Sequence, residues 1–335
     1  MRCAWLVAIG CAGCLSAVGP TGGSPATGGG ADFGAVGGNG GAGGSGGGGG
    51  SGAPGSPADL GAPADGGLVP GTLAVSWMHG QANCNASTDP ELQVHAYNAN
   101  TYIIREDKCR TFEAPFVYVL LGTRSALVLD TGATDTAALH DEVMTLVGSR
   151  PLLVAHTHAH GDHVASDDKF SGQPNTTVVA HTVAAVQAAF GIATWPTSQG
   201  SIDLGDRVLD AVAIPGHEAT HVALYDRQTG LLLTGDTLYA GLLFVSDWTA
   251  YRASVARLQQ FAAARPISHV LGAHIEMTST PTVNYAYGTT YQPDETPLPL
   301  TVHDLVALDA ALDEAGDTPQ QIVFDRFAVE PVPPD

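Results

Sequence analysis

The chain has 335 residues, with 13 lysines and arginines against 33 aspartates and glutamates, which gives a formal net charge of −20. Because nucleic-acid affinity comes largely from Lys and Arg side chains that neutralise phosphates, this balance argues against a nucleic-acid partner. Of the 42 glycines, 23 lie between Ser16 and Gly67, so about 265 residues remain for a packed region, enough for one large domain or two small ones.

The first residues have the pattern of a secretory signal peptide. A positive charge at Arg2 precedes an apolar run over residues 4–13, which is too short to span a bilayer. We therefore expect residues 1–14 to be a signal peptide and the mature protein to be exported, to the periplasm or the cell surface. Small or apolar residues before Cys11 and Cys14 resemble a lipoprotein signal, so either cysteine can carry a lipid that anchors the protein in a membrane. The alternative is an ordinary signal peptide with incidental cysteines.

Residues 15–70 consist almost entirely of glycine, alanine, serine and proline. Such a segment cannot bury enough apolar surface to offset the entropy lost on ordering, so we expect a flexible, disordered linker. Residues 71–335 then form a single folded domain. This domain contains Cys84 and Cys109, which in an oxidising compartment can form a disulfide closing a loop of 25 residues, or can remain separate thiols.

The domain begins with strands and continues with alternating helices and strands. Short segments rich in β-branched and aromatic residues predict an antiparallel meander at 73–77, 93–97, 102–105, 116–121 and 126–130. Apolar residues at helical spacing predict helices at 135–147, 183–190, 251–264 and 302–314. Apolar runs predict further strands at 152–155, 178–179, 208–214, 222–225, 231–234, 269–271 and 322–327. This order favours two packed sheets with helices outside them.

Four histidines and an aspartate lie in the eight residues 156–163, directly after the predicted strand 152–155. So many titratable groups cannot belong to an apolar core, so they either lie at the surface or bind metal. Neutral imidazoles and carboxylates suit zinc and similar divalent ions. Because residues two apart project the same way, His158 and His160 can share one ion, while Asp162 and His163, after Gly161, can face a second.

Three later strand ends offer further ligands. His217, Asp236 and His274 each follow an apolar run and a glycine, which lets the backbone turn tightly where the strand ends. The pattern predicts that these side chains meet the histidine-rich loop at a common rim.

These motifs resemble those of the metallo-β-lactamase superfamily: Thr-His-x-His-x-Asp-His at 157–163, Pro-Gly-His at 215–217, Gly-Asp-Thr at 235–237 and Gly-x-His at 272–274. The resemblance, which runs from about residue 116 to residue 274, implies an α+β fold in the form of a four-layer αββα sandwich. It also implies two zinc ions per chain, with iron or manganese as alternatives. The implied ligands are His158, His160 and His217 for the first ion and Asp162, His163 and His274 for the second, with Asp236 bridging both.

Such a ligand set implies a hydrolase that acts on a small molecule. A hydroxide held between two divalent ions is available near neutral pH and can attack the carbonyl of a small ester, lactone or thioester. Asp162 is expected to orient or deprotonate this water, and Asp236 to hold both ions, so both count as catalytic. Asp130, in an Asp-x-Gly turn, resembles the family residue that supports the metal loop.

Three alternatives stay open. A zinc β-lactamase would hydrolyse an amide, although Asp236 resembles the glyoxalase II and lactonase branches, since zinc β-lactamases carry cysteine or serine there. A dioxygenase of the same superfamily would use a single iron and fewer ligands. A non-catalytic zinc-binding surface lipoprotein would bind metal without turnover.

Other residues receive ordinary roles. His156 projects opposite to His158, so we expect it to pack or to support a ligand, and we expect His181 and His221 to be structural. Tyr239 can reach the substrate. The stretch 281–299 forms either a lid over the metals or a packed loop.

Overall fold

The computed structural model describes residues 67–333, so the predicted signal peptide and nearly all of the predicted linker lie outside the described residues. The first sheet has six strands that follow one another in chain order. Strands β1 to β4 pair antiparallel, which confirms the predicted meander from its second strand onward, whereas β5 and β6 join in parallel. These strands are β1 (Leu92–Asn98), β2 (Thr101–Glu106), β3 (Phe116–Leu121), β4 (Ala126–Leu129), β5 (Leu152–Ala155) and β6 (Thr176–Val178).

The second sheet has five strands in the spatial order β12-β10-β9-β8-β7. They are β7 (Gln199–Asp203), β8 (Val208–Ala213), β9 (Val222–Asp226), β10 (Leu231–Gly235) and β12 (His269–Gly272). Strands β8 and β10 both pair antiparallel with β9, and β12 runs parallel to β10, so the carboxyl ends of β8, β10 and β12 lie at the same edge. A small third sheet contains β11 (Leu242–Val245), β13 (Ile322–Val323) and β14 (Ala328–Pro331).

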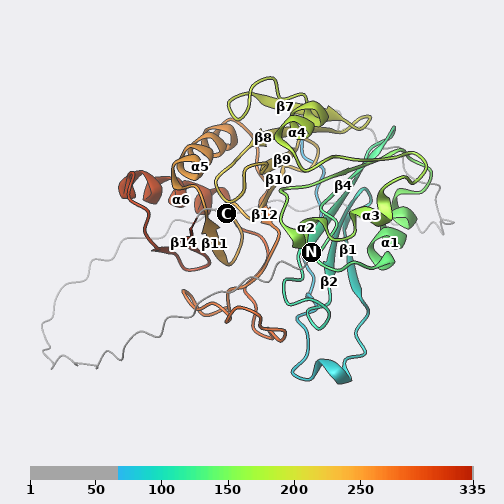
Figure 1. Ribbon diagram of the computed structural model, residues 1–335, viewed down its shortest axis with the longest axis horizontal. Helices are drawn as coiled ribbons and strands as arrows, with labels where there is room; N and C mark the ends of the chain where they lie inside the picture. Colours follow the sequence, from blue (N-terminus) through green and yellow to red (C-terminus); the bar gives the residue numbers. More distant parts are fainter. Residues whose placement is uncertain (1–66, 334–335) are drawn as a thin grey trace, which may run out of the picture. The chain divides into compact units, whose positions relative to one another are not determined.

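Helices cover the outer faces of the two large sheets. Figure 1 shows α1 and α3 beside the strands of the first sheet and α5 and α6 beside those of the second. The layers therefore run helix, sheet, sheet, helix, which confirms the predicted αββα sandwich. The helices are α1 (Ala137–Val147), α2 (Gly161–Val164), α3 (Asp167–Phe170), α4 (Val183–Phe190), α5 (Trp248–Ala263) and α6 (Val302–Ala315), with a 3-10 turn, η1, at Cys84–Ala86.

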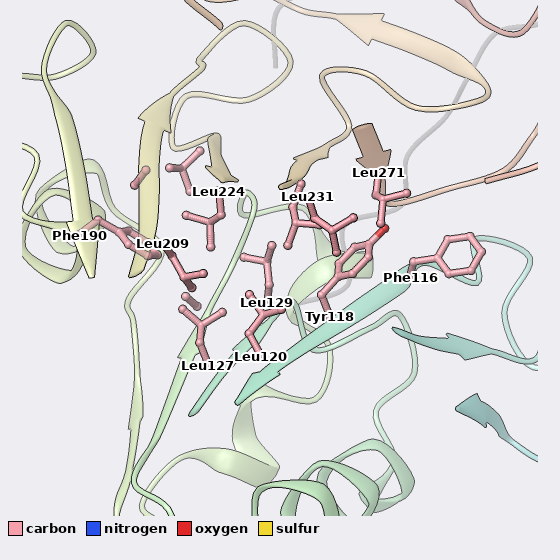
Figure 2. Close-up of a cluster of buried hydrophobic side chains, with 14 of the residues drawn as sticks. Phe116, Tyr118, Leu120, Leu127, Leu129, Phe190, Leu209, Leu224, Leu231 and Leu271 are labelled. Atoms are coloured by element: carbon pink, nitrogen blue, oxygen red, sulfur yellow. The ribbon is translucent and has the colours of Figure 1, made fainter. Parts of the chain in front are cut away.

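The two large sheets face each other across an apolar core. Along β3, Tyr118 and Leu120 belong to this inner core, whereas Val117 and Val119 pack on the opposite face toward α1. Successive side chains of a strand point to opposite faces, so a strand buried on both sides is apolar throughout. Figure 2 shows the inner core, in which the first sheet's side chains meet Leu209, Leu224, Leu231 and Leu271 of the second sheet.

The helices of the second sheet's outer face are fixed at their first turns. The carboxylate of Asp247 accepts a hydrogen bond from the backbone N–H of Ala250 (2.9 Å), so α5 starts before the predicted residue 251. The hydroxyl of Thr301 and the carboxylate of Asp304 cap α6 reciprocally. Among residues 67–333, no helix has the length and apolar character needed to cross a membrane.

One predicted strand is wrong and another is too long. Residues 73–77 form no strand, because the side chain of Gln93 bonds the carbonyl of Ser76 (2.9 Å) and the N–H of Met78 (2.5 Å), where a ladder would need backbone partners. The predicted strand at 322–327 is reduced to β13, since the chain then turns and the N–H of Phe324 donates to the carbonyl of Phe327 (2.9 Å). The short elements β7, β11, α2 and α3 lie where no element was predicted, since runs of four or five residues carry little periodicity.

Cys84 and Cys109 form a disulfide, which confirms that pairing over two separate thiols. Replacing both cysteines with serine is expected to lower the free energy of unfolding by about 3 kcal/mol, because the cross-link removes loop-closure entropy from the unfolded chain. Urea denaturation of the oxidised parent and the double variant measures the difference. A reducing agent should destabilise the parent by a similar amount and leave the double variant unchanged; equal stability of the oxidised parent and the variant would contradict this expectation.

Candidate metal centre

The seven predicted ligand residues come from four strand ends that meet at one edge of the sandwich. The loop after β5 and the short helix α2 carry four of them, and the segments after β8, β10 and β12 carry one each. The carboxyl ends of these last three strands lie at the same edge of the second sheet, as described above. The structure thus brings together His158, His160, Asp162, His163, His217, Asp236 and His274.

The first group of potential ligands consists of three histidines. The Nδ1 atom of His160 lies 3.0 Å from Nε2 of His158 and 3.0 Å from Nε2 of His217. The Nδ1 atom of an imidazole carries either one proton or one lone pair, so it cannot satisfy both neighbours with hydrogen bonds. Three ring nitrogens that converge in this way fit a divalent cation better than they fit one another.

The second group consists of Asp162, His163, Asp236 and His274. Nε2 of His274 lies 3.3 Å from Nε2 of His163 and 3.4 Å from Oδ2 of both Asp162 and Asp236. Asp236 also faces the first group, because its Oδ2 lies 3.7 Å from Nε2 of His217. Its Oδ1 is buried and accepts no hydrogen bond from the described residues. The Asp236 carboxylate therefore lies between the two groups.

The pKa of a histidine in the first group and the pKa values of the histidines in the second group shift in opposite directions. Burial lowers the pKa of His158 well below its usual value, and the neighbouring imidazoles of His163 and His221 act in the same direction. Burial also lowers the pKa of His163, but the carboxylates of Asp162, Asp236 and Asp130 outweigh this effect and raise it well above its usual value. The pKa of His274 is raised in the same way, against burial, by Asp236 and Asp162. The second group thus holds positive charge between two carboxylates.

The donor set fits divalent metal ions. Zinc takes neutral imidazole and carboxylate ligands, and both groups offer these donors at short mutual distances. Oδ1 of Asp236 is buried and accepts no hydrogen bond from the described residues, so its lone pairs are available to a metal ion. Protons on His163 and His274 supply the positive charge that the carboxylates require, and a divalent cation can supply the same charge.

Asp130 supports the second group from behind. Its Oδ2 lies 2.9 Å from Nδ1 of His163, and its Oδ1 accepts a hydrogen bond from the N–H of Thr157 (2.7 Å). The residue has a positive φ of 72° at the turn after β4, where its carboxylate can reach both partners. Such a bond fixes the tautomer and the orientation of a ligating imidazole.

Replacing Asp130 with asparagine is expected to weaken zinc binding about 10- to 100-fold, because an asparagine at this position would tolerate the positive φ but would hold His163 less firmly. Competition with a chromophoric chelator measures the affinity. The exposed Asp141, on α1, gives the matched variant Asp141→Asn, which should bind zinc like the parent. Equal affinities in the two variants would contradict this role of Asp130.

Gly235 allows the end of β10 to approach the histidine loop. Its φ is +49°, and an added Cβ would lie 2.6 Å from Nε2 of His221 and 2.7 Å from Cβ of Thr157. Any larger residue would push Asp236, the next residue, away from the loop. The glycine of the predicted Gly-Asp-Thr motif is therefore required by close packing as well as by backbone conformation.

The remaining histidines near the centre stand outside both groups. Nε2 of His156 lies 2.8 Å from Oδ1 of Asp167, and Nε2 of His181 lies 2.8 Å from Oδ2 of the same carboxylate. His221 is fully buried, with its Nδ1 3.2 Å from the hydroxyl of Thr237. His156 and His221 are thus packed inside the protein, as the sequence predicts.

A cleft of about 210 Å³ opens beside the two groups. Sequence reasoning missed Glu113 and Glu276 in its wall, because neither belongs to a motif. Burial raises the pKa of Glu113 to about 7. The hydroxyl of Tyr239 donates to Oε2 of Glu276 (3.0 Å). The residues that line the cleft include four carboxylates and neither lysine nor arginine: Glu113, His160, Asp162, His217, Asp236, Tyr239, Phe244, Ser246, His274, Glu276, Tyr287 and Val332.

The stretch 281–299 packs beside this cleft. The N–H of Tyr285 donates to the carbonyl of Glu276 (2.8 Å), and its hydroxyl accepts from the N–H of Asp294 (2.8 Å). Tyr287 is 78% exposed, and its ring lies 4.9 Å from that of Phe112. The stretch is therefore a hydrogen-bonded, largely exposed loop that contributes one tyrosine to the cleft wall.

Comparison with known proteins gives a family match over the part of the chain that contains the seven candidate ligands. A model of the metallo-beta-lactamase superfamily matches residues 110–274, which include all seven residues of the two groups. The chain is 26% identical over 208 residues to the acyl-coenzyme A thioesterase MBLAC2 of Gallus gallus, covering 48% of this chain and 72% of that protein. It is 28% identical over 125 residues to a hydroxyacylglutathione hydrolase of Rippkaea orientalis, covering 36% of this chain and 47%, about half, of that relative. Among solved structures, a metallo-beta-lactamase from Pontibacter korlensis matches with a TM-score of 0.43 and 20% identity, over 55% of this chain and 91% of that one.

Proposed function

Because the chain belongs to the metallo-beta-lactamase superfamily, it is a metal-dependent hydrolase, and we propose that it cleaves a small ester, lactone or thioester with two bound zinc ions. The observation that carries the proposal is the pair of adjacent ligand groups, with Asp236 between them, in the wall of an open cleft. In this proposal His158, His160 and His217 hold one ion, Asp162, His163 and His274 hold the other, and Asp236 contacts both. Iron or manganese could take the place of zinc, since both accept the same donor types.

Bound divalent ions supply a water of lowered pKa and polarise the substrate carbonyl. The chain's own carboxylates position the reacting atoms. Oδ2 of Asp162 lies 3.3 Å from Nε2 of His163, and its side chain is 23% exposed at the cleft. His163 and His274, against the opposing effect of burial, hold the pKa of Asp162 well below its usual range, so it is an ionised acceptor that can orient a water or take its proton. Asp236 fixes the spacing of the two groups.

The charge of the cleft narrows the substrate class. The names of the relatives describe thioesters of coenzyme A and of glutathione, and both of these carriers are anionic. The cleft of this chain is lined by Glu113 and Glu276 in addition to the two aspartates, with neither lysine nor arginine. Lys108 interacts with both glutamates but is buried, and its ammonium donates to the carbonyl of Phe112 (3.0 Å). We therefore propose a neutral or cationic substrate. Its size is modest, because about 210 Å³ lies below the roughly 300–1,000 Å³ of typical ligand pockets.

The proposed location is outside the cytoplasm. The disulfide between Cys84 and Cys109 supports export, because such bonds persist in oxidising compartments. Attachment to a membrane through a lipid on Cys11 or Cys14 is part of the same proposal and concerns residues outside those described. Labelling with a radioactive fatty acid, compared between the parent and a variant in which both cysteines are alanine, tests the attachment.

Metal analysis coupled to a substrate panel tests the proposed function. Protein stripped of metal with a chelator should no longer hydrolyse the panel's carbonyl substrates. Hydrolysis should return on addition of zinc and reach its full rate when two ions are bound in the catalytic groups of each chain. The panel pairs neutral esters, lactones and thioesters with anionic analogues, and includes a chromogenic β-lactam. Turnover of the β-lactam alone would indicate a zinc β-lactamase in place of the proposed hydrolase. Zinc binding without any turnover would favour a zinc-binding lipoprotein.

A further inference from the structure

A third cluster of metal-ligating side chains lies outside the two groups. His156 follows β5, Asp167 begins α3, and His181 follows β6. Their potential ligand atoms all lie within 4.8 Å of one another. The three side chains are 5%, 19% and 35% exposed, so the cluster reaches from the protein interior to the solvent. Its donors, two imidazoles and one carboxylate, are those of an open zinc site with a water in the remaining position.

The geometry of the cluster is close to that of a metal site. The two Nε2 atoms each lie 2.8 Å from a different oxygen of Asp167, and the imidazole rings of His156 and His181 are 4.8 Å apart at an angle of 87°. Zinc–donor bonds of about 2.0 to 2.2 Å place tetrahedral ligands roughly 3.3 Å apart. Both contacts with Asp167 are shorter than this spacing, so each would lengthen slightly to admit an ion.

The cluster lies at the base of the loop that carries four of the candidate ligands, so an ion bound there would affect this loop. His156 and Asp167 stand at the two ends of the loop that carries His158, His160, Asp162 and His163, and they are 11 residues apart. The hydroxyl of Thr131 donates to Oδ1 of Asp167 (2.7 Å), and its N–H donates to the carbonyl of His163 (2.8 Å). An ion bound by the cluster would close the base of this loop and restrict the motion of its ligands.

We propose that His156, Asp167 and His181 form an accessory site for a divalent cation of the zinc class, which clamps the loop of the catalytic centre. The site is separate from the two catalytic groups, and its existence does not depend on which substrate the protein cleaves. Removing one imidazole from it should abolish binding of this ion, since two remaining protein donors hold zinc weakly.

Zinc content of the full-length protein tests the proposal. Parent, His181→Ala and His303→Ala are equilibrated at one buffered concentration of free zinc, and bound zinc per chain is measured by mass spectrometry of the metal. His303 is an exposed histidine of α6, so its variant controls for adventitious binding to surface imidazoles. We expect His181→Ala to hold one zinc fewer than both the parent and His303→Ala.

A second variant and a second readout separate the clamp from an ordinary hydrogen-bonded cluster. Asp167→Asn keeps the size of the side chain and should lose the same single ion. Exchange of the remaining zinc with a chelator should be faster in both variants than in the parent, because the loop is no longer closed. Equal zinc content in the parent and in both variants would overturn the proposal, whether or not the protein hydrolyses any substrate.

Discussion

Replacing Asp236 with alanine is expected to lower kcat/KM at least about a thousandfold, which corresponds to roughly 4 kcal/mol of activation free energy. Its carboxylate faces both ligand groups, with Oδ1 3.5 Å from Nε2 of His163 and Oδ2 3.7 Å from Nε2 of His217. The variant thus removes an oxygen from both proposed ion sites and leaves His163 and His274 without one of their carboxylate partners. Bound zinc should fall from two per chain to one or fewer, apart from any ion at the accessory site.

The matched control for this variant is His303→Ala, which removes an imidazole from an exposed position on α6. Its turnover and zinc content should equal those of the parent. Steady-state kinetics and metal analysis of the same preparations connect the two losses. Full turnover by Asp236→Ala, or by metal-free protein, would contradict the assignment of Asp236 and of the metals together.

The positions of the seven candidate ligands could be predicted because local sequence determines them. Each of the later residues follows an apolar strand and a glycine, and strands that run in the same direction within a sheet bring their ends to one edge. Gly235 illustrates this relation, since its positive φ and the short distances around it leave no room for a side chain. The Gly-Asp-Thr motif therefore reflects both the need for a ligand at Asp236 and the close packing at Gly235.

The cleft wall and the first segment of the domain could not be predicted in the same way. Glu113 and Glu276 reach the cleft from irregular segments, and nothing in their local sequence indicates which side chains lie opposite them. Residues 73–77 have a strand-like composition, yet a strand also needs a partner with free backbone groups, and Gln93 occupies those positions. Both cases depend on contacts between segments far apart in the chain.

A buried ion pair in the second sheet also contacts the first sheet. Arg207, just before β8, and Asp226, at the end of β9, are both buried, and Nη2 of Arg207 lies 2.6 Å from Oδ2 of Asp226. The same guanidinium donates to the carbonyl of Asn100 (2.5 Å), the carbonyl of Leu121 (3.2 Å) and the hydroxyl of Thr101 (2.7 Å), all at the edge of the first sheet. Arg207 therefore connects the second sheet to the first from a buried position. The candidate metal centre also draws its ligands from both sheets, so its geometry is expected to depend on how the sheets are aligned.

Replacing Asp226 with alanine is expected to lower the free energy of unfolding by about 3 to 5 kcal/mol, because the variant leaves a buried guanidinium without its counter-charge. Urea denaturation measures the loss. The double variant Arg207→Met with Asp226→Leu should lose less than Asp226→Ala alone, since no charge then remains buried. The exposed pair Arg124 and Asp203 gives the control, because its side chains are 66% and 54% exposed, and Asp203→Ala should change stability far less. If Asp226→Ala and Asp203→Ala prove equally stable, the buried pair does not hold the sheets together.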